Sequence, residues 1–210
     1  MTGRYCTRYV SITVRMICDM SATLTARQVD LLDRLTDLVV AEGFAHLTLD
    51  DLAARLRCSK TTLYALAPSK DQLAVRVVNN FFRRSTASVE ARVAQRRAPL
   101  RRIEAYLEAV AEALRPASRQ FIDDIAGFEP TRATYRDNAV AAARRVRELV
   151  DEAAAEKAVA PVDAAFVATW VGVTIEAIQR GEFAERAGLG DAAAFEELGR
   201  LVSRALARPV

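Results

Sequence analysis

Apolar residues recur every three to four positions along most of the chain, which is the spacing of one face of an amphipathic helix. The repeat is clear in Leu32, Leu35 and Val39, and it is most regular between residues 100 and 114. No stretch alternates between apolar and polar residues as a half-buried strand does. Helix-breaking glycine and proline are scarce, with 8 and 6 among 210 residues. The pattern predicts an all-α fold of about nine helices.

Capping signals indicate where the first four helices begin. Four residues stand where an N-cap hydroxyl accepts a hydrogen bond from the first turn, namely Thr25, Thr48, Ser59 and Ser69. Gln28 and Gln72 follow two of these caps at the spacing of a capping box. Gly43 is placed to end the first helix in the left-handed conformation. We expect the third helix to reach about Leu66 and the fourth to reach the mid-90s.

Five further helices are expected behind these four, bounded by prolines, glycines and the apolar period. They are 100–114, 118–125, a helix through Val140 and Val150 that closes before Pro161, 162–179, and a last helix capped by Asp191. Residues 1–20 lack this period, so we expect a flexible tail or a start codon assigned too early. The alternative is a basic arm that reaches into a minor groove with Arg4, Arg8 and Arg15.

Residues 48–67 combine a helix of about two turns, a short turn at 57–59 and a second short helix. This is the arrangement of a helix-turn-helix, in which the second helix enters the DNA major groove. The groove accepts one helix whose leading end carries small side chains. The spacing therefore predicts a DNA-binding motif at this place in the chain.

Candidate DNA contacts lie at the start of the second helix of this motif and just after it. One cation and two short hydroxyls suit base edges at the leading end of the helix, and these are Lys60, Thr61 and Thr62. The hydroxyl of Tyr64 and the ammonium of Lys70 suit backbone phosphates. In the alternative interpretation, Tyr64 is a half-buried packing residue and Lys70 is a solvated residue of a first helical turn.

Two stretches resemble the tetracycline-repressor (TetR) family of transcriptional regulators. Residues 43–53, GFAHLTLDDLA, are similar to the end of the first helix and the start of the second in that family. Residues 59–64, SKTTLY, and 68–73, PSKDQL, are similar to its recognition helix and the opening of its fourth helix. The resemblance covers roughly residues 25–80, where several spaced positions agree at once.

The resemblance implies a three-helix DNA-binding domain over 21–75 and a helical effector-binding and dimerisation domain over 76–210. It implies a homodimer, formed through 162–179 and 192–206, that binds a palindromic operator in double-stranded DNA. A small-molecule effector would release this repressor. By resemblance, the phosphate contacts are Thr48, Tyr64 and Lys70, and the base-facing residues are Lys60, Thr61 and Thr62. Thr48 is equally compatible with a helix cap alone.

The sequence departs from the family pattern at three positions near the recognition helix. The family often has glycine at the position of Thr61, and commonly histidine and then phenylalanine at those of Leu66 and Ala67. Leu66 cannot donate a hydrogen bond to a phosphate. Because Ala67 leaves space between the helices, we expect Leu66 or Phe44 to fill it.

Charge is distributed unevenly along the chain. Residues 76–102 hold eight arginines and one glutamate, whereas 21–75 hold six basic and seven acidic residues. Such asymmetry is typical of a chain of which one part meets a polyanion. The predicted DNA-binding domain would therefore depend on the arginine stripe of 76–102 or on the N-terminal arm. The alternative is that the stripe is a solvated helix face.

Six aromatic residues of the C-terminal part are candidates for lining an effector cavity between helices. They are Tyr106, Phe121, Phe128, Tyr135, Phe166 and Trp170. An ordinary hydrophobic core accounts for the same residues equally well.

Residues for catalysis or metal binding are not evident in the sequence. His46 is the sole histidine, which excludes a His-containing triad elsewhere and the paired-histidine iron sites of helical bundles. Cys6, Cys18 and Cys58 lack metal-ligand spacing, and their odd number favours a reduced cytoplasm. No apolar run reaches about 18 residues. We expect no enzyme activity, cofactor, metal or membrane partner. The alternatives are an adaptor, or a helical enzyme or ligand carrier with a vestigial helix-turn-helix.

Overall fold

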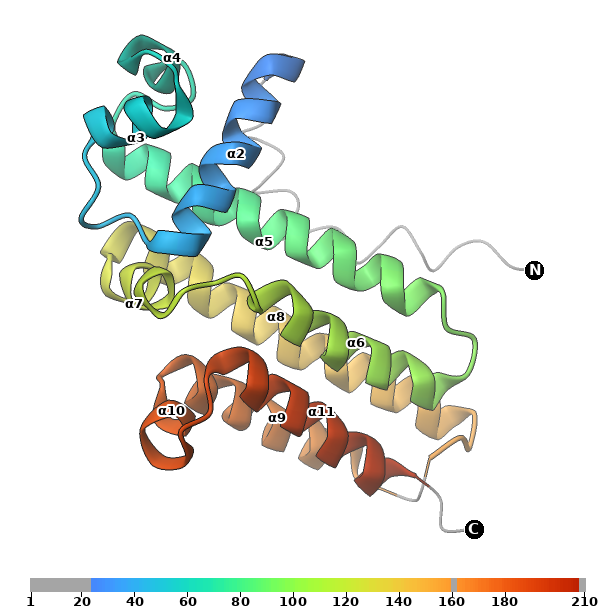
Figure 1. The fold of residues 1–210 in the computed structure, drawn as a ribbon. Helices are drawn as coiled ribbons and strands as arrows, with labels where there is room; N and C mark the ends of the chain where they lie inside the picture. The colour runs from blue at the N-terminus through green and yellow to red at the C-terminus, as the bar shows by residue number, and fades with distance from the viewer. Residues whose placement is uncertain (1–23, 160–161, 208–210) are drawn as a thin grey trace.

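The computed structural model describes residues 24–159 and 162–207. The expectations for residues 1–20 therefore lie outside the described part of the chain. All of its regular secondary structure within those ranges is α-helical, which confirms the all-α prediction (Figure 1). No helix in the two described ranges is long and apolar enough to cross a membrane.

Ten helices follow one another in the described residues. They are α2 (Ala26–Glu42), α3 (Leu49–Leu56), α4 (Lys60–Tyr64), α5 (Lys70–Ala94), α6 (Pro99–Leu114), α7 (Arg119–Gly127), α8 (Glu129–Ala155), α9 (Ala164–Gln179), α10 (Glu182–Ala187) and α11 (Asp191–Leu206). Nine of them lie where the apolar period predicts a helix. The tenth, α10, was not predicted because six residues between Gly181 and Gly188 are too few to show a period.

The caps at the helix ends agree with the sequence signals, with three differences. Ser69 accepts from the Gln72 amide at 3.2 Å, which is only half of the predicted capping box. Asp191 is the first residue of α11, and Gly190 is the cap. Gly43 has φ 86° and ψ −180°, so its φ is positive but its conformation is not the left-handed helical one.

Two clusters of buried side chains form the core, and α5 contributes to both. The first cluster joins α2, α3, α4 and the start of α5 to α7 and to Tyr135 of α8. The second joins Val89 and Val93, near the end of α5, to α6, α8, α9 and α11. The expected domain boundary at residues 75 and 76 therefore falls inside one continuous helix.

The arrangement places the N-terminal helices at one end of a helical bundle. In Figure 1, α2, α3 and α4 gather around the start of α5, while α6 and α8 run beside its length. Helices α9 and α11 lie on the side of the bundle away from α5, where α11 packs on α6 and α9 packs on α8. Helices α5 and α7 connect α2, α3 and α4 to the rest of the bundle.

We expect Phe121→Ala to destabilise the whole N-terminal part, because this α7 side chain is 0% exposed and meets Phe81 of α5 edge-on at 5.2 Å. Deleting a buried phenyl ring costs about 3–5 kcal/mol of unfolding free energy, which urea unfolding would measure. Val140→Ala is the control, since Val140 is 64% exposed. Equal effects of the two substitutions would contradict the assignment of α7 to the first cluster.

Candidate nucleic-acid interface

The α3–turn–α4 unit is held by its own backbone and caps. Arg57 takes the left-handed conformation at the end of α3, with φ 51° and ψ 48°. The Cys58 amide then returns to the Ala53 carbonyl at 2.9 Å, which is typical of a helix C-cap. Ser59 caps α4 by accepting from the Thr62 amide at 3.1 Å. Leu63 anchors α4 because its side chain is buried in the first cluster.

Neighbouring helices hold the unit through the carbonyls that its short helices leave free. Gln28 of α2 donates to the Ala65 carbonyl at 3.4 Å, and Arg76 of α5 donates to the Leu66 carbonyl at 2.5 Å. Sequence reasoning missed these two contacts, because no local spacing connects a side chain to a carbonyl in another helix. They fix α4 against α2 and α5 without using its outer face.

The three base-facing candidates lie together at the start of α4. Lys60 and Thr61 are exposed, and Thr62 is half-buried. The Thr62 hydroxyl lies 2.8 Å from the Ser59 hydroxyl, so it also takes part in the cap. The leading end of α4 is thus open to solvent, and its exposed side chains are those of Lys60 and Thr61.

Lys60 does not stand alone at this surface. Its Nζ lies 2.7 Å from Oδ1 of Asp50 on α3, and both side chains are at least half exposed. The hydrogen bond to Asp50, together with the carboxylate charge, raises the pKa of Lys60 above its ordinary value. Sequence reasoning did not single out Asp50, since its partner lies across the turn. The pair partly neutralises the cation that the interpretation assigns to bases.

The three phosphate candidates have different surroundings. The Thr48 hydroxyl donates to Asp51 Oδ2 at 2.6 Å and accepts from the Asp51 amide, so Thr48 is a cap in a complete capping box. Tyr64 is 49% exposed. Lys70 donates to the Ala45 carbonyl at 3.1 Å, which uses one of its three N–H groups. These residues remain candidates, and Thr48 and Lys70 have structural contacts as well.

The departures from the family pattern are absorbed by packing. Leu66, Ala67 and Phe44 are all buried in the first cluster. Leu66 and Phe44 lie in the same cluster as Ala67, and which of them fills the space beside Ala67 stays a prediction. Cys58 is partly buried against the same cluster, and this burial raises the pKa of its thiol. A raised thiol pKa disfavours the reactive thiolate and favours a packing role for Cys58.

The arginine stripe does not lie beside the recognition helix as a whole. Arg84 pairs with Asp33 and Asp37 of α2, and Arg102 pairs with Glu152 of α8. Arg92 is 22 residues beyond Lys70 on the same helix, a separation of roughly 33 Å at 1.5 Å per residue. Helix α5 therefore carries the second half of the stripe to the far end of the bundle, away from α4 (Figure 1). That the DNA-binding domain depends on this stripe or on the N-terminal arm stays a prediction, since the arm lies outside the described residues.

The six aromatic candidates for an effector cavity are distributed over three environments. Phe121, Phe128 and Tyr135 belong to the first cluster or pack against it, whereas Tyr106 is buried in the second. Phe166 and Trp170 are on the outer face of α9, and Phe166 is 71% exposed. The structure therefore brings Phe121, Phe128 and Tyr135 into one cluster but does not bring all six around one cavity.

Tyr135 differs from the other aromatic candidates in its polar end. Its ring stacks on Phe82 with centroids 6.3 Å apart. Its buried hydroxyl has no hydrogen-bond partner among the residues that the structure describes. Burial, followed by the charge of Asp191, raises the pKa of Tyr135 above its ordinary value. Of the six, Tyr135 is the one whose buried polar atom remains available to a ligand.

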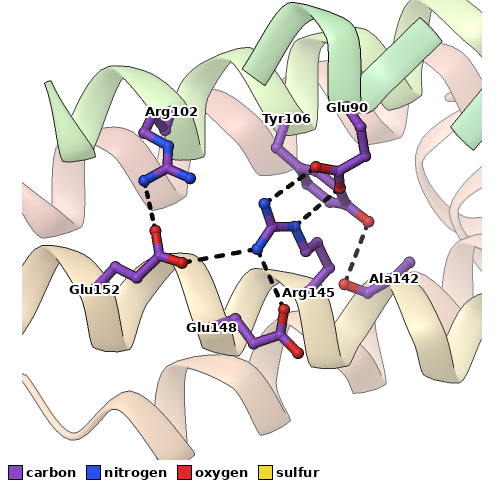
Figure 2. Close-up of polar contacts among 7 residues, drawn as sticks. All are labelled: Glu90, Arg102, Tyr106, Ala142, Arg145, Glu148 and Glu152. Carbon is purple, nitrogen blue, oxygen red and sulfur yellow. Dashed lines mark hydrogen bonds and ion pairs between the residues drawn. The ribbon is translucent and has the colours of Figure 1, made fainter. Parts of the chain in front are cut away.

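A polar network crosses the second cluster and was not foreseen from the sequence. Figure 2 shows Arg145 of α8 with its guanidinium directed at Glu90 of α5, at 2.9 and 3.1 Å. Arg145 also meets Glu148 at 3.2 Å and Glu152 at 3.9 Å. Burial disfavours its charge, but the hydrogen bonds that Arg145 donates to Glu90 and the charges of the nearby carboxylates outweigh burial and raise the pKa of Arg145. The network ties α5 and α6 to α8.

Residues 31–77 match the sequence model described as bacterial regulatory proteins, tetR family. The match runs from α2 into the second turn of α5 and includes all of α3, the turn and α4. This part of the chain is therefore similar to the tetR family. A comparison with curated proteins finds no significant match.

Solved structures extend the likeness beyond the matched residues. A TetR/AcrR-family regulator from Thermobifida fusca is 20% identical, covers 88% of this chain and 100% of its own, and has a TM-score of 0.61. A TetR-family regulator from Agrobacterium tumefaciens is 16% identical, covers 87% and 98%, and has a TM-score of 0.65. AibR in complex with isovaleryl coenzyme A and operator DNA is 21% identical, covers 88% and 100%, and has a TM-score of 0.58. The C-terminal bundle thus shares the fold of these regulators.

We expect Asp50→Asn to strengthen binding of this chain to duplex DNA. The substitution removes a negative charge from the exposed surface beside Lys60. Because one carboxylate fewer then repels the phosphates, the affinity should rise most at low salt, and the plot of log K against log salt should become steeper. Fluorescence anisotropy at several salt concentrations would measure this. Asp137→Asn, an exposed change on α8, should leave the slope unchanged, and an unchanged slope for Asp50→Asn would contradict the expectation.

Proposed function

We propose that this protein is a transcriptional regulator that binds a palindromic operator in double-stranded DNA as a homodimer. In this proposal it represses transcription until a small-molecule effector releases it. The observation that carries the proposal is the open leading end of α4, set on a tetR-family helix-turn-helix. We assign base contacts to Lys60, Thr61 and Thr62, and phosphate contacts to Thr48, Tyr64 and Lys70.

The geometry of α4 supports the assignment of the reading surface. The helix has five residues, and its first turn carries no acidic side chain. The side chains of Lys60 and Thr61 are exposed, whereas that of Leu63 is buried. A recognition helix reads base edges with its N-terminal residues while flanking groups hold the phosphates. The exposed Tyr64 and the start of α5 at Lys70 flank α4 in this sense.

The outer surface of α9 and α11 supports the dimer. Phe166, Val173 and Leu201 are large apolar side chains that are more than half exposed there. An apolar groove of about 390 Å³ lies between the two helices, and its lining includes Phe166, Trp170 and Val202. Exposed apolar surface of this kind is typical of a protein interface. Two-fold symmetry through this face would present two recognition helices to half-sites about 34–36 Å apart.

The effector step is supported by the comparison with AibR, which is described in complex with isovaleryl coenzyme A and operator DNA. A ligand releases DNA only if it binds a conformation with different spacing of the recognition helices more tightly than the DNA-bound one. In this chain we place the effector contacts among Phe121, Phe128 and Tyr135. The partnerless hydroxyl of Tyr135 would supply a polar contact inside an otherwise apolar cluster.

We expect Lys60→Ala and Tyr64→Phe to separate base contacts from phosphate contacts. A duplex selected by the wild-type protein from a random pool serves as operator, with its scrambled sequence as the reference. Lys60→Ala should cost about 1–3 kcal/mol on the operator and much less on the scrambled duplex. Tyr64→Phe should weaken both duplexes alike, since phosphates carry no sequence information. Anisotropy titrations of both duplexes would measure the ratio.

Lys70→Ala extends this test, with an expected salt slope lower by about one unit. Ala94→Ser, at the far end of α5, is the control. If the wild-type chain selects no sequence from the pool, the proposed function is wrong. If it does, but Lys60→Ala keeps the wild-type ratio between operator and scrambled duplex, the reading surface has been assigned to the wrong residues.

We expect Leu201→Glu to dissociate the dimer, because it places a charge on the apolar outer face of α11. Leu201 is 54% exposed in the single chain, so the substitution should leave the fold intact. Light scattering should then give a mass near 23.1 kDa, and operator affinity should fall with the loss of the second half-site. Ala94→Glu, on α5, is the matched control. A wild-type protein that is monomeric at micromolar concentration would refute palindromic recognition.

A further inference from the structure

Helix α7 holds the loop between α2 and α3 with a buried carboxylate. Asp124 is only 7% exposed. Its Oδ2 accepts hydrogen bonds from the backbone amides of Phe44 at 2.5 Å and Ala45 at 2.8 Å. Its Oδ1 accepts from the Gln120 side chain at 2.6 Å. Both carboxylate oxygens are therefore committed, and 80 residues of sequence separate the carboxylate from the Phe44 amide.

The loop lies so close to α7 that one of its residues has no space for a side chain. A Cβ at Gly43 would lie 2.6 Å from Cγ of Gln120 and 2.7 Å from Oδ2 of Asp124. The φ of 86° at Gly43 also belongs to the region that favours glycine. The role of Gly43 is thus wider than ending α2, because it lets the backbone approach the Asp124 carboxylate.

Other contacts hold the loop and the end of the helix before it. The amide of Ser118, the cap of α7, donates to the carbonyl of Val40 in the last turn of α2 at 2.9 Å. The Phe44 ring meets Phe128, just after α7, edge-on at 5.8 Å. On the other side, Lys70 at the start of α5 donates to the Ala45 carbonyl. The loop is held between α7 and the first residue of α5.

The opposite side of α7 faces the C-terminal helices. Arg119 pairs with Asp123 at 2.9 Å, and its guanidinium lies against the backbone of Gly181, between α9 and α10. Helix α7 has nine residues. Its side chains touch both the turn after α9, through Arg119, and the loop before α3, through Asp124.

We propose that Asp124 is a positioning residue for DNA recognition: it anchors the start of α3 to α7, and thereby sets where α4 presents Lys60 and Thr61. The inference rests on the proposed function and adds a residue of the C-terminal part to the DNA-binding apparatus. Charge-assisted hydrogen bonds to two successive amides fix both the distance and the orientation of the loop. The amides of Phe44 and Ala45 have no alternative acceptor if the carboxylate is removed, so the loop then moves toward water.

Asp124→Asn tests the anchor with little change in volume. An amide side chain keeps one acceptor oxygen for the two backbone amides but loses the negative charge, so the hydrogen bonds to Phe44 and Ala45 are no longer charge-assisted and become weaker. The matched control is Thr131→Val on α8. Its buried hydroxyl donates to the Ile125 and Phe128 carbonyls at 2.9 and 3.0 Å without touching the loop. Both variants weaken buried hydrogen bonds at the α7–α8 junction, but only Asp124→Asn weakens the hold on the loop.

The first measurement is hydrogen exchange of the full-length dimer without DNA. Asp124→Asn is expected to speed exchange at Phe44 and Ala45 at least tenfold, and Thr131→Val is expected to leave both amides unchanged. The second measurement is the affinity for the selected and scrambled duplexes. Asp124→Asn should lower the ratio between them at least tenfold, with the dimer intact by light scattering. Asp124→Glu, which keeps the carboxylate, should recover part of both effects.

The outcomes separate the inference from the proposed function. If wild-type protein selects no duplex, the proposed function fails, and the exchange measurement still decides whether Asp124 anchors the loop. If wild-type protein selects a duplex and Asp124→Asn matches Thr131→Val in both measurements, Asp124 is an ordinary buried residue and the inference is overturned. Faster exchange with an unchanged duplex ratio also overturns it, because the loop would then be held without positioning α4.

Discussion

Helix α5 is the constraint on which the two parts of the molecule depend. Its first half is buried against α2, α3 and α4, and its second half against α6 and α8. A helix of 25 residues is stiff over its length. Lys70, at the start of α5, and Glu90, which Figure 2 shows in the Arg145 network, are therefore fixed relative to each other by one helix. The N-terminal and C-terminal parts have separate cores, and α5 contributes side chains to both of them.

Charge around the recognition helix is balanced by close pairing. Lys60 meets Asp50, and Lys70 meets a carbonyl, so neither ammonium is fully available in the unbound chain. Exposed pairs of this type contribute little to stability because water screens them. Their cost to DNA binding is correspondingly small, since a phosphate can replace a carboxylate at a solvated site. This accounts for a reading surface without a basic excess in the surrounding domain.

The C-terminal bundle combines an apolar core with polar groups that are satisfied in most places. Arg145 has three carboxylates around it, which compensates for its partial burial. Tyr106 donates to the Ala142 carbonyl at 3.4 Å in the same region. The Tyr135 hydroxyl is the exception, at the junction of α7 and α8 near the DNA-binding end. A ligand at this junction would contact the helix that also holds Asp124.

The caps and the apolar period are local properties, and the sequence by itself determined them. Thr25 with Gln28, Thr48 with Asp51, and Ser59 with its own first turn act over three residues, so spacing alone identified where α2, α3 and α4 begin. Only the tertiary structure decided the partners that lie far apart in the chain. Asp124 reaches Phe44 across 80 residues, and α5 carries Arg92 away from the DNA-binding end. Only the tertiary structure also decided that the six aromatic candidates lie in two separate cores and on one outer face. Burial depends on which helices meet, and an amphipathic pattern shows that a face is covered without naming the helix that covers it.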